Sequence, residues 1–342
     1  MKYLFLFTFL PLFVLGQDQI ETTIIPKPYN PKPYFDQLNK TKLKKVIIIS
    51  KQKQDNFKDD TTYVYEYNEY GQQVSSLRYE NNKITTKTIM KYDKYDNQIE
   101  WKIFEPNQTL TTTNFYFNQF NQLDSTKQVS YREKKIIHTS RYAYQYENGK
   151  LKFRQIIFNN ILNRDDSYDY NDSLLVNYKS ILSPDVYFVT NYSYDNYSHL
   201  AEINTTHFFN TKSELWNKKN FNYQNGKLIS EEELTYDNKK IFAHYYYNLD
   251  NKLQKIVSTF AENNRDIEFE YNDFDIKEIT VNTNSNSTYL KFYIPLRLEN
   301  VTFPIVYKEK FTYDKENNLI NKKNFVNDDL VKESVYLIEY YK

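Results

Sequence analysis

Clustered carboxylates are the residues of this sequence with the most direct capacity for chemistry. Two acids across a sugar ring can hydrolyse a glycosidic bond, and several acids on one loop can bind calcium. The candidates are the run Glu231–Glu233 and the pair Asp165 and Asp166. On a strand, neighbouring side chains point to opposite faces, and no Asp-x-Asp-x-Asp loop surrounds either group. We therefore interpret both groups as solvated charge, and a secreted hydrolase whose carboxylates meet only in the folded chain stays open as an alternative.

Histidine and glycine patterns give no further catalytic set. The four histidines lack the His-x-x-x-His and Glu-x-x-His spacings of metal sites; they are His138, His199, His207 and His244. Four glycines cannot supply a nucleophile elbow, a phosphate-binding loop or a dinucleotide fingerprint. The sequence therefore predicts no metal and no cofactor, favours a non-enzymatic protein, and leaves the catalytic residues unknown.

Aromatic side chains are the remaining candidates for ligand contact, because the chain holds 35 Tyr, 24 Phe and 2 Trp. Rings placed two residues apart read first as a core or a cross-strand ladder. Rings outside that phase, at or near turns, are better placed to stack on a sugar or to line a peptide groove. The candidates of this kind are Trp216, Tyr70, Tyr95 and Tyr197.

A repeat positions these rings. An aromatic anchor recurs ten times, at steps of 25, 25, 29, 24, 24, 29, 24, 24 and 42 residues, usually with a second ring two residues earlier and an Asn or Asp directly after it. The anchors are Tyr67, Tyr92, Phe117, Tyr146, Tyr170, Tyr194, Tyr223, Tyr247, Tyr271 and Tyr313. The preceding position is aromatic in nine copies, and the following residue is Asn or Asp in eight. Such a period indicates a repeat architecture.

Each repeat reads as two strands and two turns. In Ile267–Tyr271 the apolar residues alternate with Glu268 and Glu270, which is typical of an antiparallel sheet with one wet face. Asn148-Gly149 and Asn225-Gly226 are strong hairpin signals, because both central residues of a type I′ turn need positive φ. The sequence thus predicts an all-β fold, a continuous antiparallel meander of about 22 strands.

The motif Tyr-x-Tyr-Asn/Asp, followed by Gly or Asn and then an aliphatic residue, resembles the YD repeat of the RHS (rearrangement hot spot) family. The matching stretches are YEYNEYGQQV, YQYENGKL, YSYDNYSHL, FNYQNGKL, YYYNLDNKL and FTYDKENNL. The resemblance implies a sheet that spirals into a shell, which in large members encloses a C-terminal toxin. This chain ends on a predicted strand, 334–341, without a further domain, so the toxin role is not carried over.

The segments before the repeats have a different character. Residues 1–16 carry one Lys and an apolar run, which is typical of a signal peptide cleaved after Gly16. Residues 17–45 form a leader with alternating Pro and Lys, and 46–342 form the repeat domain of about ten to eleven units. With no cysteine the exported chain has no disulfide. We expect a periplasmic, cell-surface or extracellular protein without a transmembrane segment after the signal is removed.

The net charge of the chain makes some classes of binding partner unlikely. The formal net charge is +1, which provides no field to attract nucleic acid. The leading hypothesis is a secreted or cell-surface protein that presents an extended β-surface to a glycan or another protein. An outer-membrane β-barrel is an alternative, because an even number of strands and aromatic richness both fit it.

The shape follows from the number of strands, since twisted sheets rarely exceed about ten strands without curling. We predict a single coiled sheet, a spiral or partly closed shell, with the aromatic face inward. Val46–Ser50 is predicted to be the first strand and to cap the edge of this sheet.

Overall fold

The protein is described by a computed structural model that covers residues 43–52, 59–81, 83–272, 276–285, 303–315 and 318–341. The expected signal peptide and nearly all of the expected leader lie outside these residues. The boundary expected at residue 45/46 falls inside the first strand, which begins at Leu43. No helix within the described ranges is long and apolar enough to cross a membrane.

The described chain is an antiparallel meander, as predicted, and its single sheet has 22 strands. The strands are β1 (Leu43–Gln52), β2 (Asp59–Tyr67), β3 (Gln73–Glu80), β4 (Lys83–Tyr92), β5 (Gln98–Phe104), β6 (Thr109–Phe117), β7 (Leu123–Arg132), β8 (Lys135–Glu147), β9 (Lys150–Phe158), β10 (Ile161–Asn171), β11 (Leu174–Ser183), β12 (Val186–Tyr194), β13 (Leu200–Phe209), β14 (Lys212–Gln224), β15 (Lys227–Thr235), β16 (Lys240–Tyr247), β17 (Leu253–Phe260), β18 (Asn263–Tyr271), β19 (Ile276–Thr283), β20 (Ile305–Tyr313), β21 (Leu319–Val326) and β22 (Asp329–Tyr340).

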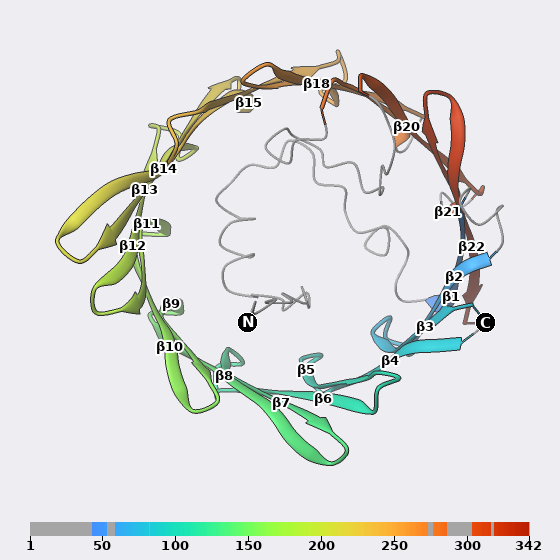
Figure 1. Cartoon of the computed structure of the whole chain (residues 1–342), viewed down its shortest axis with the longest axis horizontal. Coiled ribbons are helices and arrows are strands. Elements are labelled where there is room, and N and C mark those ends of the chain that lie inside the picture. Colours follow the sequence, from blue (N-terminus) through green and yellow to red (C-terminus); the bar gives the residue numbers. More distant parts are fainter. Residues whose placement is uncertain are drawn as a thin grey trace, which may run out of the picture.

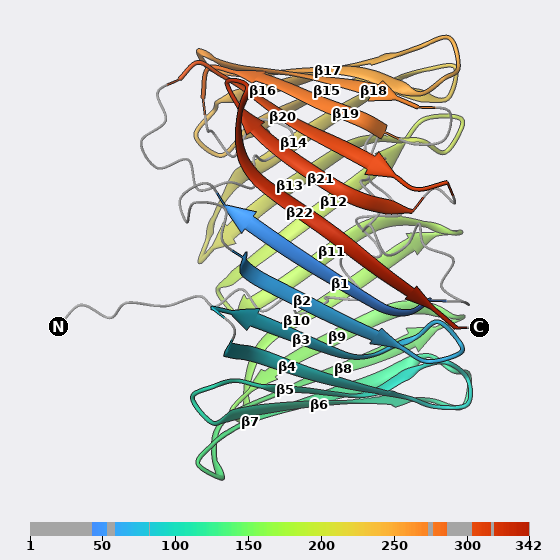
Figure 2. The same ribbon diagram turned by 90° about the vertical axis from the view of Figure 1, so that its right-hand side faces the viewer.

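The sheet closes on itself, so the expectation of a spiral or partly closed shell was wrong. β1 pairs antiparallel with β2 on one side and with the last strand, β22, on the other. Figure 1 shows the resulting ring and Figure 2 the tilted strands of its wall. β1 therefore does not cap an edge: it joins the two ends of the meander, which pairs backbone groups that an open sheet would expose.

The number of strands sets the size of the barrel. With neighbouring strands about 4.8 Å apart and a tilt of about 40°, 22 strands give a wall roughly 140 Å around and about 45 Å across. The two ends differ in their connections. The turns that follow the anchors lie at one end, here called the anchor end, and the mid-repeat turns lie at the opposite end, as the antiparallel order requires.

One face of the wall is buried and holds both apolar and polar side chains. In β18, Ile267 and Phe269 are buried whereas Glu268 and Glu270 are exposed. We assign the buried face to the inside of the barrel, because side chains on the concave side of a curved wall converge and cover one another. The largest core cluster extends over β13–β21 and includes Tyr245 and Tyr307. These buried rings agree with the predicted inward aromatic face.

The outer face carries many ion pairs, and exposed apolar and aromatic side chains lie between them. Glu100 lies between Lys91 and Lys102, at 2.8 and 2.9 Å from their Nζ atoms. Lys255 reaches both Asp266 and Glu268 on the neighbouring strand. Each exposed pair contributes at most about 1 kcal/mol, but together they give the outer wall a surface suited to water.

Every anchor lies at a register shift in the sheet. All ten follow a β-bulge with the next strand, from Glu66/Tyr67 to Thr312/Tyr313. Six anchor hydroxyls donate to a backbone carbonyl of the preceding repeat, for example Tyr194 to Leu175 at 2.8 Å. The others are Tyr92, Tyr146, Tyr247, Tyr271 and Tyr313. The repeat therefore combines a bulge toward the following strand with a tyrosine hydroxyl bonded back to the preceding repeat.

Closure can be tested at the seam, where Ser50 and Ser334 are paired and their buried hydroxyls lie 2.9 Å apart. Because the chain has no cysteine, we expect the double variant Ser50→Cys/Ser334→Cys to form a disulfide under mild oxidation. Gel mobility without reductant and thiol titration provide the measurement. The pair Ser258→Cys/Ser334→Cys, whose strands are not neighbours, is the control. Two free thiols in the folded seam variant would rule out the closed barrel.

The anchor bond can be tested with two matched tyrosines. Tyr194→Phe removes the donor to Leu175, and we expect the free energy of unfolding to fall by about 1 kcal/mol. Tyr223→Phe is the control, since this anchor hydroxyl is buried without a hydrogen-bond partner and its loss should be neutral or slightly stabilising. Urea denaturation measures both variants, and equal losses would contradict the role given to the bond.

Candidate functional site

The anchor end carries a set of five-residue turns with a shared internal scaffold. In the turn between β2 and β3, Asn68 Oδ1 accepts hydrogen bonds from the backbone N–H groups of Tyr70 and Gln72, both at 3.0 Å. The chain reverses at Gly71, which has φ +76°. The Asn or Asp that follows an anchor therefore acts as the internal brace of the turn.

The same brace recurs in three other turns. Asp93 accepts from Tyr95 at 2.7 Å, Asn118 from Phe120 at 2.9 Å and Asp195 from Tyr197 at 2.8 Å. The side-chain amide of Asn97 also donates to Asp93, and this hydrogen bond holds the pKa of that carboxyl below its usual value. The turn is thus preformed by its own polar side chains and by the backbone N–H of the residue at its third position.

An aromatic residue occupies that third position in all four turns and is exposed. The exposed fractions are 78 % for Tyr70, 63 % for Tyr95, 73 % for Phe120 and 82 % for Tyr197. Large exposed rings held on ordered backbone are a recurrent feature of binding surfaces, because little side-chain entropy is lost when a ligand binds.

Three of these turns stand side by side and are tied together. Gln72 donates to Asp96 of the next turn at 3.0 Å, and Asn97 donates to Asn121 of the turn after it at 2.6 Å. Neighbouring turns are two strands apart, so the rings recur at about 10 Å along the wall. We call the row formed by Tyr70, Tyr95 and Phe120 the aromatic rim.

A hollow of about 600 Å³ lies between the first two turns of the aromatic rim. Its lining includes Tyr70, Lys94 and Asp96. Lys94 also places its Nζ 4.8 Å from the centre of the Tyr95 ring, a cation–π contact. The hollow thus presents an exposed ring beside a cation and a carboxylate, which is a suitable surface for a ligand with hydroxyl groups.

The four predicted candidates do not form one site. Tyr70 and Tyr95 belong to the aromatic rim. Tyr197 occupies the same turn position, but the short turns that follow β8 and β10 separate it from that row. Phe120 was missed, although it stands three residues after the anchor Phe117, as Tyr70 does after Tyr67; only its being Phe rather than Tyr set it apart.

Trp216 lies toward the opposite end of the barrel. Its ring stacks on Tyr236 at 5.2 Å and meets His207 edge-on at 5.6 Å. This residue occupies a register shift between β13 and β14 and remains partly exposed. It belongs to a separate aromatic cluster that does not adjoin the rim.

The two carboxylate groups were misread in part. Glu231 is buried and accepts a hydrogen bond from Tyr245 at 3.0 Å, and Asp166 is buried beside Arg154. Both belong to the inner phase of their strands, whereas Glu232 and Asp165 belong to the outer one. The prediction that neighbouring carboxylates point to opposite faces was thus correct, but Glu231 and Asp166, on the inner face, are not solvated. Among the described residues, no three His, Cys, Asp or Glu side chains are grouped closely enough to hold a metal ion.

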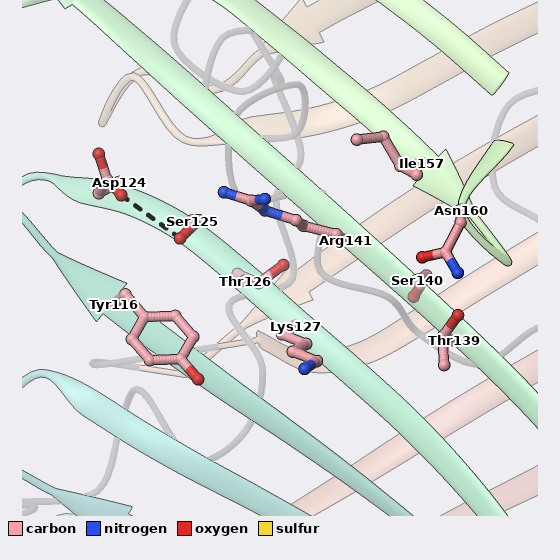
Figure 3. Close-up of a pocket in the computed structure, with 10 residues that line it drawn as sticks. All are labelled: Tyr116, Asp124, Ser125, Thr126, Lys127, Thr139, Ser140, Arg141, Ile157 and Asn160. Atoms are coloured by element: carbon pink, nitrogen blue, oxygen red, sulfur yellow. Dashed lines mark hydrogen bonds between the residues drawn. The ribbon is translucent and has the colours of Figure 1, made fainter. Parts of the chain in front are cut away.

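A second hollow, of about 570 Å³, lies over β6–β9 (Figure 3). Its lining includes Tyr116, Lys127 and Arg141. The close-up shows side chains from several neighbouring strands, with Asp124 accepting a hydrogen bond from Ser125. The lining has one aromatic ring only and no shared scaffold, so the aromatic rim is the better candidate.

No protein-family model and no curated protein matches the chain. Among solved structures, it resembles TcdB2-TccC3-TEV, with 10% identity, 79% of this chain and 16% of that chain covered, and a TM-score of 0.41. The Photorhabdus luminescens Tc holotoxin pore gives 11% identity, the same coverage and a TM-score of 0.35. A porin-like protein from Bacteroides uniformis gives 8% identity, coverage of 87% and 96%, and a TM-score of 0.28. Likeness at this level carries no argument about function, and this chain spans only 16% of the two toxin chains.

Proposed function

We propose that this chain is an exported, non-enzymatic barrel that binds carbohydrate at its aromatic rim. One observation carries the proposal: Tyr70, Tyr95 and Phe120 are exposed in a row on braced turns that are hydrogen-bonded to one another. An isolated exposed ring needs no explanation, but an ordered row of three does.

The chemistry of the rim suits a sugar chain. Aromatic faces stack on the apolar faces of sugar rings, while the side chains of Gln72, Asp96 and Asn97 lie in the same turns and can exchange hydrogen bonds with hydroxyl groups. The braced turns are ordered before the ligand arrives, which reduces the entropy lost on binding. The spacing of about 10 Å between turns would let one extended chain meet several rings.

The tyrosine-rich motif supports an RHS-like repeat as the origin of the wall. Because the barrel is closed, its ligand surface is not the open sheet first expected but the ends and outside of a ring. The hydrolase alternative has no residues assigned to it: Glu231 and Asp166 are both occupied by hydrogen bonds within the wall.

An outer-membrane barrel is the second candidate, and the closed wall with its even number of strands favours it over an open β-surface. The charged side chains of the outer face favour contact with water over contact with lipid. Lys102, Lys255 and Lys323, each in an ion pair, lie on strand positions that would face lipid. A cation at the middle of the bilayer destabilises such a barrel by about 2–4 kcal/mol.

Sugar binding can be tested with a rim variant. We expect the purified protein to bind members of a glycan array, with affinity confirmed by calorimetry, and Tyr70→Ala/Tyr95→Ala/Phe120→Ala to abolish binding at an unchanged melting temperature. Leu249→Ala is the matched control, because Leu249 is fully exposed in the equivalent turn after β16. Binding that survives in the triple variant, or an array without any hit, would refute the proposal.

Cell fractionation can test whether the barrel is inserted in the outer membrane. We expect the exported protein to be recovered without detergent, either in the soluble fraction or washed from the surface with salt. Recovery only from detergent-extracted outer membranes would overturn this expectation and establish the second candidate. Sugar binding is measured separately, so the two results can be told apart.

A further inference from the structure

The inner wall holds a buried group of charges that the aromatic rim does not use. It lies on three neighbouring strands and comprises Arg154 of β9, Arg164, Asp166 and Tyr168 of β10, and Tyr178 of β11. The Arg154 Nε and Nη2 atoms donate to Asp166 Oδ2 at 2.8 and 2.5 Å. Arg164 Nε donates to Asp166 Oδ1 at 2.7 Å. We call these five residues the inner arginine cluster.

The cluster contains two guanidinium groups and one carboxylate. Both oxygens of Asp166 are already engaged, and Oδ1 also accepts from the Tyr178 hydroxyl at 2.9 Å. Arg154 and Asp166 are only 1% and 2% exposed, so little water reaches the pair. Burying an ion without a counter-ion is unfavourable, and the two arginines of this cluster share a single acid among the described residues.

A buried donor in the same place is also unused. The Tyr168 hydroxyl has no hydrogen-bond partner, although Tyr168 is 1% exposed. It interacts electrostatically with Arg154, and burial raises its pKa, so the hydroxyl keeps its proton and is available as a donor. Buried hydroxyl groups without a partner are uncommon in proteins and call for an explanation.

A buried acid elsewhere on the inner wall is balanced by a cation. Glu309 is met by Lys322 at 2.8 Å and by the Tyr307 hydroxyl at 2.6 Å. The inner arginine cluster has the opposite composition, with more cations than acids.

We propose that the inner arginine cluster binds an oxyanion, a phosphate, sulfate or carboxylate group, on the inside of the barrel. Arg164 is the entry point, because its side chain is 24% exposed while Arg154 and Asp166 are covered. The planar guanidinium groups offer several donors in a fixed geometry that matches such anions. The Tyr168 hydroxyl supplies a further donor, and Asp166 holds the two arginines side by side.

The experiment is a titration of the full folded protein with inorganic phosphate, sulfate and acetate, followed by calorimetry and by melting temperature in a low-chloride buffer. We expect at least one anion to bind at a single site and to raise the melting temperature as its concentration passes Kd. Preference for phosphate or sulfate over acetate would assign a tetrahedral anion, and the reverse a carboxylate; either result supports the site.

Variants decide whether the binding belongs to this cluster. Arg164→Gln should weaken binding at least tenfold, and Tyr168→Phe should weaken it less, because it removes one neutral donor. Arg141→Gln on the outer face is the control, and it should bind like the unchanged protein. The triple variant of the aromatic rim, Tyr70→Ala/Tyr95→Ala/Phe120→Ala, should also bind the anion like the unchanged protein. No binding of any of the three anions, or the same binding after Arg164→Gln, would overturn the proposal.

Discussion

The hydrogen bond from an anchor tyrosine to the preceding repeat is the interaction on which the barrel depends. The Tyr92, Tyr146, Tyr194 and Tyr247 hydroxyls each donate to a carbonyl 19 or 23 residues earlier, at 2.8–3.0 Å. The bulge at each anchor faces the following strand and the ring reaches back to the preceding one, so one residue both shifts the register and fastens its hairpin to the hairpin before it. Tyr341 makes the final bond of this kind, to Tyr67 at 2.6 Å, across the seam between the last and first hairpins.

A repeated bulge at one end of every hairpin also explains the two surfaces of the barrel. It keeps the rings of successive anchors on the inner side and places their turns in line at one end. The Asn or Asp beside the anchor then braces the turn, and the next residue but one is pushed outward. The aromatic rim is thus a by-product of the way in which the wall is built, and it is available for selection as a binding surface.

Local features of this fold could be read from the sequence and long-range ones could not. The anchors, the Asn148-Gly149 turn and the alternation in β18 depend on neighbours within a few residues, and the structure has each of them. Closure depends on the pairing of β1 with β22, which joins residues nearly 300 positions apart through the summed twist of all strands. The exposure of Tyr70 followed from its phase, but its alignment with Phe120 needed the order of the turns. The burial of Asp166 was missed because its partner Arg154 lies on another strand.

The distribution of charge separates the functions that the two surfaces can support. The outer wall and the turns hold exposed charge pairs, which are individually weak, so the neutral ligand that we propose would be held mainly by stacking. The inner wall is buried around its few ionised groups, and there an unbalanced guanidinium acts over a longer range because less water screens it. A barrel built from one repeat therefore presents a neutral, aromatic contact at its end and a cationic contact inside. Because the two proposed sites share no residue, we expect the loss of either to leave the other intact.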